Sequence, residues 1–571
     1  MSVKPWLGAM GKPTGWEYGK TDDAPNVTLE LEHVYGYRAQ AVRQNVVWID
    51  KKTVLYFSAG VGIVHNVETN TQKFFRGHTD DILCLAYHPG RRIAVTGEKG
   101  RYPSIHVWDV DTCEELAKIA GFHSRGVCSV AFSLDGGKVA SVGLDDNHSI
   151  AVYDWARGNL LASEEGDTAR ILDVQFNMTA EADSNNDFIT VGLKHIKFWT
   201  VTSGGTLEQK KGLLGNLGER QAFLNSASTS QYTIVGTQNG EMYLFKGRKL
   251  AKVVAAHQKS IYAIKGYGDS VVTGGKDGYV SRWDMNTFEK TGSVNLNKVE
   301  DPAVLKHTTN YVRAVDCLSK DEIVVGTLTS SIYKVKFSTS SIQPLMQAHY
   351  GNLDARRFHG ELWGIASAPN GQRFVSAGED NTLRIWDCEQ RKMVSMVQLD
   401  GPAQCVTWSP CGQYMAVGLH TGSVVFLDKD AEEIKAVTKC RRRVQSVRFS
   451  PSSKLVAVGS ADNVIHIYDV ESDFKFKGKL KGHSSVILKM DFSADEKYLQ
   501  TCSQSYELLF FNLEEMKQHT RSRELKDTEW ATFTSILGWD VQGIWPKYSD
   551  GSDVNAVTRS RDKKLLATAE D

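Results

Sequence analysis

Short runs in which apolar and polar residues alternate recur along almost the whole chain. Two of them are Ser446-Val447-Arg448-Phe449-Ser450 and Val464-Ile465-His466-Ile467-Tyr468. Such alternation is typical of a β-strand with one buried face, and the Gly, Asp, Asn and Ser residues between the runs favour turns. The pattern therefore predicts an all-β protein built from short antiparallel strands.

These strands group into a unit that repeats roughly every 40 to 53 residues. The clearest copy contains His359-Gly360-Glu361-Leu362-Trp363 and ends at Leu383-Arg384-Ile385-Trp386-Asp387. Other copies end at Trp108-Asp109, Tyr153-Asp154, Trp199-Thr200, Trp283-Asp284, Leu427-Asp428, Tyr468-Asp469 and Phe511-Asn512, and degenerate copies end near Leu244 and Tyr333. A four-stranded unit cannot bury both of its faces alone, so we expect the units to pack radially as blades of β-propellers.

The number of units predicts two propellers in tandem. A chain of 571 residues exceeds the roughly 250 to 300 residues at which one hydrophobic core stops growing. About seven units end before residue 345 and five to six follow, the last of them incomplete. The predicted domains are an extended leader (1–30), a hydrophobic motif with the first blade (31–66), the remainder of the N-terminal propeller (67–345) and a C-terminal propeller (346–571).

Several units place an aspartate six residues before their terminal aromatic residue. The pairs are Asp277 with Trp283, Asp380 with Trp386, and Asp462 with Tyr468. They resemble WD repeats, in which the turn aspartate anchors the histidine of a Gly-His dipeptide, and that histidine reaches the tryptophan through a hydroxyl residue. Gly77-His78 and Gly482-His483 match the dipeptide. We expect these side chains to satisfy buried polar groups and to have no catalytic role.

A second resemblance begins at Leu31. The run Val34, Tyr35, Gly36, Tyr37 and Arg38, followed by Arg43 and Asn45, resembles the hydrophobic (HELP) motif that opens the echinoderm microtubule-associated protein-like family. Further matches are Val191-Gly192-Leu193-Lys194-His195-Ile196-Lys197-Phe198-Trp199 and Val541-Gln542-Gly543-Ile544-Trp545-Pro546-Lys547-Tyr548. The resemblance covers residues 31–571, although His33 stands where the family has Trp and the chain stops at Asp571, where the family continues into another strand.

This resemblance implies a non-enzymatic protein that binds tubulin or microtubules, with other cytoskeletal or ciliary proteins as further partners. We expect the motif to be buried and to join the two propellers, because Val34, Tyr35, Tyr37, Tyr56 and Phe57 are too apolar to be exposed together. A scaffold for another protein complex is the alternative, since propeller faces serve many partners. The sequence contains no catalytic, cofactor or metal motif, but an enzyme site assembled from different blades stays open.

The positive and negative charges of the chain balance, so any strongly charged partner would have to be bound by a local patch. Lys plus Arg and Asp plus Glu both number 67, so no overall field attracts nucleic acid or an anionic membrane. The nine cysteines form no C-x-x-C pair, and no secretory leader or membrane-spanning run is present, which predicts a cytoplasmic, cytoskeletal setting with a cilium as one possibility. The candidate tubulin-binding residues are Arg441, Arg442 and Arg443, whose alternative interpretation is an ordinary solvated loop, as for Arg91-Arg92 and Lys563-Lys564.

Overall fold

The chain forms two compact units. The computed structural model describes residues 5–17, 26–40, 42–298, 310–351, 360–541, 543–544, 554–560 and 562–570. The N-terminal unit is Leu31–Tyr350, and the C-terminal unit is Gly351–Asp571 together with Met1–Glu30. In the described ranges the helical elements are three short 3-10 helices, η1 (Pro5–Ala9), η2 (Leu296–Lys298) and η3 (Ser522–Leu525), and the remaining regular elements are strands. The prediction of an all-β protein is confirmed.

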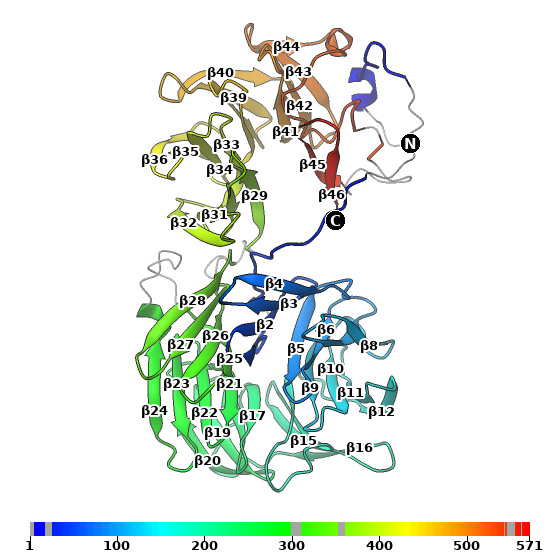
Figure 1. Cartoon of the computed structure of the whole chain (residues 1–571), viewed down its shortest axis with the longest axis vertical. Coiled ribbons are helices and arrows are strands. Elements are labelled where there is room, and N and C mark those ends of the chain that lie inside the picture. The colour runs from blue at the N-terminus through cyan, green and yellow to red at the C-terminus, as the bar shows by residue number, and fades with distance from the viewer. Residues whose placement is uncertain are drawn as a thin grey trace. The chain divides into compact units, whose positions relative to one another are not determined.

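Within the described residues, the N-terminal unit holds seven four-stranded antiparallel sheets in chain order, arranged as propeller blades (Figure 1). The first four blades are β1 (Val46–Asp50), β2 (Thr53–Ser58), β3 (Val61–Asn66) and β4 (Thr71–Phe75); β5 (Ile82–His88), β6 (Ile93–Glu98), β7 (Ser104–Asp109) and β8 (Glu115–Ala120); β9 (Val127–Phe132), β10 (Lys138–Gly143), β11 (Ile150–Asp154) and β12 (Asn159–Glu164); and β13 (Ile171–Phe176), β14 (Asp187–Gly192), β15 (His195–Val201) and β16 (Leu207–Lys211). The other three are β17 (Phe223–Ser228), β18 (Thr233–Thr237), β19 (Glu241–Lys246) and β20 (Lys249–Ala255); β21 (Ile261–Tyr267), β22 (Ser270–Gly275), β23 (Tyr279–Asp284) and β24 (Lys290–Asn295); and β25 (Val312–Cys317), β26 (Glu322–Thr327), β27 (Ser331–Lys336) and β28 (Ser341–Gln347).

The described part of the C-terminal unit holds four complete blades and one two-stranded sheet. The complete blades are β29 (Leu362–Ser367), β30 (Arg373–Gly378), β31 (Thr382–Asp387) and β32 (Lys392–Gln398); β33 (Ala403–Trp408), β34 (Tyr414–Leu419), β35 (Ser423–Asp428) and β36 (Glu433–Thr438); β37 (Val444–Phe449), β38 (Leu455–Ser460), β39 (Val464–Asp469) and β40 (Lys475–Lys481); and β41 (Ile487–Phe492), β42 (Tyr498–Ser503), β43 (Leu508–Asn512) and β44 (Lys517–His519). The two-stranded sheet is β45 (Val554–Arg559) with β46 (Leu566–Glu570). The predicted tandem of propellers is confirmed, with a shorter sheet as the last one.

Burial falls from the inner strands of a blade to its outer edge. All six residues of β6 are buried, whereas β8 is mostly exposed. Blades then pack face to face: Trp108, which ends β7, is fully buried and stacks on Phe75 of the preceding blade with ring centroids 4.8 Å apart. Because one face of each sheet covers the next, the hydrophobic core is divided among the blade interfaces.

The inner strands of neighbouring blades lie against one another, and β1 contacts β25. The N-terminal ring therefore closes between its first and seventh blades. One hydrogen bond across this closure runs from the Trp48 N–H to the Asp316 carboxylate over 2.8 Å, between residues 268 positions apart in sequence.

Three details of the domain organisation differ from the sequence pattern. The first blade extends to Phe75, past residue 66, and a boundary at residue 345 would cut β28, because Ser338-Thr339-Ser340 forms the turn between β27 and β28. Residues 5–17 pack onto the C-terminal unit, where Thr14 donates hydrogen bonds of 2.6 and 2.8 Å from its backbone N–H and hydroxyl to Asp527. Among the described residues of the expected extended leader (1–30), Pro5–Ala9 form η1, whereas residues 10–17 and 26–30 form neither helix nor strand.

All nine cysteines are free thiols, and Cys84, Cys440 and Cys502 are buried as expected of core residues. Cys388 and Cys411 are exposed, because both lie in turns outside the strands. In the described part of the chain, no helix is both long and apolar enough to cross a bilayer.

Candidate functional site

The hydrophobic motif, residues 34–38, is held to the first blade by polar contacts. The Tyr37 hydroxyl donates a 2.7 Å hydrogen bond to the Asn45 side chain, whose amide donates to the Arg38 carbonyl over 2.5 Å. Arg38 also pairs with Asp81 over 2.6 Å. The Gln72 side-chain amide accepts a 2.7 Å hydrogen bond from the Val34 N–H and donates a 3.2 Å hydrogen bond to the Val34 carbonyl. These bonds fold the motif back onto the strands that follow it.

The apolar side chains of the motif fill the seam between the first and seventh blades. Tyr37 and Tyr56 are buried in one cluster with Ala314, Val324 and Ile332 of the seventh blade. Burial raises the pKa of Tyr37 strongly, against weaker lowering by Arg313 and Asn45. Val34 and Tyr35 are half-buried, and Gly36 lies beside them against Ser58. The motif thus closes the N-terminal ring, and its role in joining the two propellers stays a prediction.

Asp277 and Trp283 are linked by a buried hydrogen-bond chain. The Asp277 carboxylate lies 3.0 Å from Nδ1 of His257, Nε2 of His257 lies 2.8 Å from the Thr273 hydroxyl, and the Trp283 indole donates to that hydroxyl over 3.0 Å. The hydrogen bond and the charge of His257 lower the pKa of Asp277, although burial, the largest influence, raises it. Each buried polar atom has a partner, so the set behaves as a structural crosslink.

Asp380 and Asp462 make other contacts. Asp380 pairs with the buried guanidinium of Arg384 over 3.2 Å, while the Trp386 indole donates to Ser376 over 2.7 Å. Arg384 lies on β31, and His359, the expected histidine partner, lies outside the described residues.

Asp462 accepts a 2.9 Å hydrogen bond from the Arg441 backbone N–H and lies 4.0 Å from His466. Cys440 occupies the position before Arg441 where a Gly-His histidine would stand, so the aspartate holds the loop backbone directly. The Tyr468 ring at the end of this strand is fully buried between Phe426 and Phe476.

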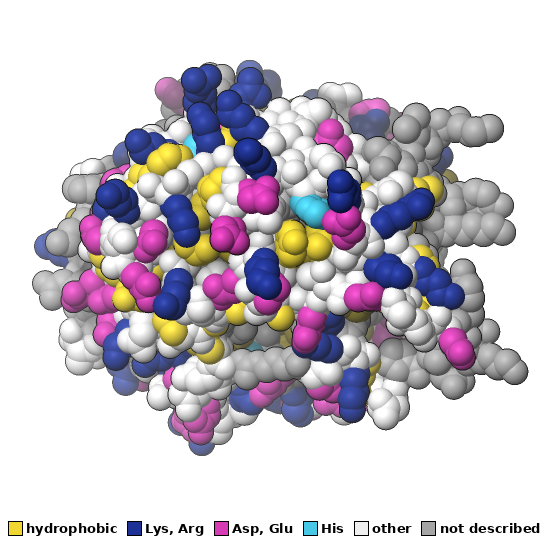
Figure 2. Space-filling view, turned by 90° about the horizontal axis from the view of Figure 1, so that it is seen from above, with side chains coloured by type: hydrophobic (Ala, Val, Ile, Leu, Met, Phe, Trp, Pro, Cys, Tyr) yellow, Lys and Arg dark blue, Asp and Glu magenta, His cyan; other side chains and the backbone are white. Residues whose placement is uncertain are grey.

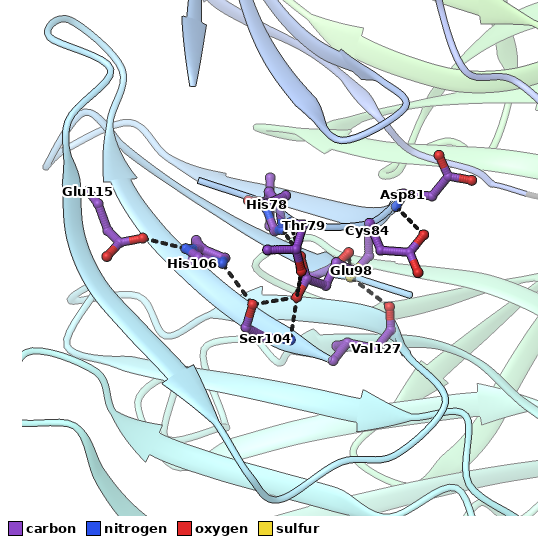
Figure 3. Close-up of polar contacts among 12 residues, drawn as sticks. His78, Thr79, Asp81, Cys84, Glu98, Ser104, His106, Glu115 and Val127 are labelled. Carbon is purple, nitrogen blue, oxygen red and sulfur yellow. Dashed lines mark hydrogen bonds and ion pairs between the residues drawn. The ribbon is translucent and has the colours of Figure 1, made fainter. Parts of the chain in front are cut away.

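The second blade contains the largest of these networks, shown in Figure 3. His78, Glu98 and His106 offer ligand atoms within 4.8 Å of one another, a spacing that suits a metal ion. Every imidazole nitrogen already has a partner, however: His78 contacts Glu98 and Thr96, and His106 contacts Ser104 and Glu115. Burial raises the pKa of Glu98, but hydrogen bonds from His78, Ser104 and Thr79 outweigh it and hold the pKa far below its usual value. The chemistry of this group is that of a satisfied hydrogen-bond network.

The basic clusters differ in their surroundings. Arg441, Arg442 and Arg443 are all exposed in the loop before β37. Arg92, in contrast, donates two 2.6 Å hydrogen bonds to Asp111, and Lys563 is paired with Glu529. On the face of the C-terminal unit seen in Figure 2, Lys and Arg side chains are interspersed with Asp and Glu, so a basic patch there is local.

The comparisons with known proteins cover both propellers and the motif. The family model of the echinoderm microtubule-associated protein first beta-propeller matches residues 71–335, that of the second beta-propeller matches residues 362–571, and the HELP motif matches residues 24–63. The chain is 33% identical to the 77 kDa echinoderm microtubule-associated protein of Lytechinus variegatus over 96% of its own length and 82% of the relative. It is 32% identical to echinoderm microtubule-associated protein-like 1 of Homo sapiens, over 96% of its own length and 67% of the relative. The chain belongs to the echinoderm microtubule-associated protein family.

In this member of the echinoderm microtubule-associated protein family, sequence reasoning missed a set of structural carboxylates on inner strands. Asp173, Asp316 and Asp491 are buried and accept hydrogen bonds from backbone N–H groups of the next blade or segment. An acidic residue inside an otherwise apolar strand was the available signal, because a buried carboxylate needs donors. Their partners were not visible in the sequence, since they lie 44 to 268 residues away.

Replacing Gly326 with alanine is expected to destabilise the N-terminal unit of this family member by about 1–3 kcal/mol. A Cβ at Gly326 in β26 would collide with the Tyr37 hydroxyl and lie 3.1 Å from Val46. Urea unfolding monitors the loss, with Gly204→Ala as the matched control, since a Cβ there meets only one atom, at 3.8 Å. Equal stability of the two variants would contradict a tightly packed motif.

Proposed function

We propose that the chain binds tubulin or microtubules through its propellers, in microtubule organisation or stability, and catalyses no reaction. The observation that carries this proposal is the match to relatives named microtubule-associated proteins, which spans 96% of the chain and includes both propellers and the motif. Packed blades with little regular structure outside their strands suit recognition by preformed surfaces.

We place the contact on a basic surface defined by Lys439, Arg441, Arg442, Arg443, Lys477 and Lys479. All six side chains are exposed. Lys439 lies 5.8 Å from the Phe476 ring, and the charges of Lys479 and Lys439 both lower the pKa of His466, after burial as the main cause. The arginine loop and β40 therefore lie side by side. Tubulin's tails are acidic, so such a surface would attract them.

The proposal is tested by co-sedimentation with purified microtubules and by size-exclusion chromatography with free tubulin, each at low and physiological salt. Saturable binding that weakens as salt rises is the expected result, because screening shortens the reach of exposed charges. Absence of binding to both forms would overturn the proposal and favour a scaffold for another complex.

Replacing Arg441, Arg442 and Arg443 together with glutamine is expected to weaken microtubule binding roughly tenfold at low salt, as three exposed charges contribute up to about 1 kcal/mol each. The matched control replaces Lys210, Lys211 and Lys249, which are equally exposed on the outer strands of the N-terminal unit. Equal binding by both triple variants would show that the arginine loop is not part of the interface. It would not contradict microtubule binding itself.

A further inference from the structure

The central channel of the N-terminal propeller contains a cavity of about 810 Å³. Its wall is formed by the inner strands of the blades and by residues 42–47, the segment that follows the hydrophobic motif. Cavities of about 300–1,000 Å³ are typical of small-molecule and peptide side-chain sites. The channel is therefore large enough for a ligand.

The segment that follows the motif is pinned at this channel. The Gln44 side chain donates to the Ile264 carbonyl over 2.6 Å and accepts from the Val315 N–H over 3.1 Å, and its backbone N–H donates to the Arg313 carbonyl. Gln44 is held at a φ of 50°, in the left-handed region that non-glycine residues rarely adopt. Such a backbone conformation is kept only where surrounding bonds enforce it. These bonds fix the neighbouring Arg43 in the channel wall.

Positive charge exceeds negative charge along the cavity. Five lining residues are cationic, Arg38, Arg43, Lys99, Arg170 and Lys265, whereas the lining carboxylates are Asp173 and Asp316. Both carboxylates are already engaged. Asp316 pairs with Lys265 over 2.8 Å and accepts from the Trp48 N–H, and Asp173 accepts from the N–H and hydroxyl of Ser226 at 2.8 and 2.9 Å.

Arg43 and Arg170 both line the cavity, close to the starts of β1 and β13. Within the described residues, Arg43 and Arg170 form no ion pair with a carboxylate, although the charge of Asp173 raises the pKa of Arg43 against the effect of burial, and the guanidinium of Arg43 has no hydrogen-bond partner. Arg313 is fixed by its Nε hydrogen bond to the Val42 carbonyl and by the Tyr262 ring, 5.0 Å from its guanidinium. Burial, followed by the charge of Arg313, lowers the pKa of Arg43 to about 10. The lining holds more cations than carboxylates, so the cavity would attract an anion.

We propose that Arg43 and Arg170 bind an oxyanion group, a carboxylate or a phosphate, in this channel. A guanidinium presents a planar fork of N–H donors that matches both groups, and a cleft lined mainly by one sign of charge raises the local concentration of counter-ions. The apolar side chains of Leu83, Leu172 and Leu224 complete that wall. The carrier is either a small phosphorylated molecule or an acidic peptide segment. This site is independent of the basic surface on the C-terminal unit.

Binding is tested on the full chain by calorimetry and thermal unfolding with two probes, sodium tripolyphosphate and a hexaglutamate peptide, at constant ionic strength set with chloride. Saturable binding of at least one probe, with a raised melting temperature of the N-terminal unit, is expected. Tripolyphosphate alone would identify a small anion as the carrier, the peptide alone would identify an acidic segment, and mutual competition would mean that both enter one site. Binding of neither probe at millimolar concentration would overturn the proposal.

Arg43→Gln and Arg170→Gln are each expected to weaken binding at least tenfold. Arg170 is exposed, so its variant folds irrespective of the role of Arg43. Without a probe, Arg43→Gln is expected to melt at the same or a higher temperature than the unchanged protein, because it removes repulsion between cations; a merely structural arginine would give a lower value. Arg157→Gln, at a site 79% exposed and paired only with Asp154, is the matched control. Unchanged binding in both channel variants would indicate an adventitious ion only.

Discussion

The Asp491→Ala variant is expected to lose about 3–5 kcal/mol of stability in the C-terminal unit, because several donors around a fully buried carboxylate lose their acceptor at once. Asp491 lies in β41 and is fully buried. Its carboxylate accepts from the Thr532 hydroxyl at 2.6 Å, from the N–H and hydroxyl of Thr534 at 3.0 and 2.9 Å, and from the Ser535 N–H at 3.1 Å. This single side chain therefore ties residues 532–535 to the fourth complete blade.

Urea unfolding followed by tryptophan fluorescence measures this loss, because Trp530 lies just before the tethered residues and its ring centroid is 5.8 Å from that of Phe510. Only the transition of the C-terminal unit is expected to move, with earlier proteolysis in residues 520–541. Glu471→Ala is the control: this exposed residue pairs with exposed Lys454 and should cost less than about 1 kcal/mol. A loss equally small in Asp491→Ala would mean that the apolar contacts of the segment hold it alone.

The positions of the strands could be predicted because their cause is local. Apolar alternation and turn residues lie within a few positions of each other, so Trp108 and Trp283 end the third strands of their blades as the repeat indicates. The all-β class and the tandem of propellers followed from the same repeat. The unit boundary was less visible, because Ser338-Thr339-Ser340 has the composition of a linker but forms a turn inside a blade.

The contacts that close and link the blades depend on tertiary structure. Asp380 and Asp277 occupy equivalent positions before an aromatic residue, yet Asp380 pairs with Arg384 and Asp277 with His257. Ring closure by Asp316 and Trp48 joins residues too distant for any periodicity to relate them.

For the candidate binding residues too, the contacts of each side chain could not be predicted from the sequence. Arg91-Arg92 and Arg441-Arg442-Arg443 look alike in sequence, but the Arg92 side chain is committed to Asp111 while the three later arginines are exposed. Arg43 appeared in the sequence only as part of a family motif. Its place in the channel depends on the fixing of Gln44 by β21 and β25, which no local pattern reveals.

Acidification from about pH 7.5 to about pH 4.5 is expected to destabilise the N-terminal unit strongly, with His123 alone contributing about 3 kcal/mol over the full titration. Burial lowers the pKa of His123 to about 4, against the weaker raising effect of Asp145 at 4.0 Å. Its nitrogens are occupied by the hydroxyls of Ser141 at 2.7 Å and Ser149 at 3.0 Å. The neutral ring therefore fits the folded state and the charged ring does not.

The sign of this effect follows from the direction of the shift. An unfolded histidine titrates near pH 6.5, so the stabilisation by His123 is complete above about pH 6.5 and is lost as the pH falls toward about 4. Carboxylates with a lowered pKa, such as Glu98, contribute stability that is lost only as the pH falls below the ordinary pKa of a carboxyl group. Their contribution is therefore separated in pH from that of His123. Urea midpoints measured across this window should fall more shallowly with acid for His123→Gln than for the unchanged protein, even though the variant is less stable at neutral pH. His88→Gln, outside these networks, controls for the loss of a histidine. Parallel pH profiles for His123→Gln and the unchanged protein would show that the buried ring accepts a proton without opening the blade, and the acid sensitivity would then belong to the remaining histidines.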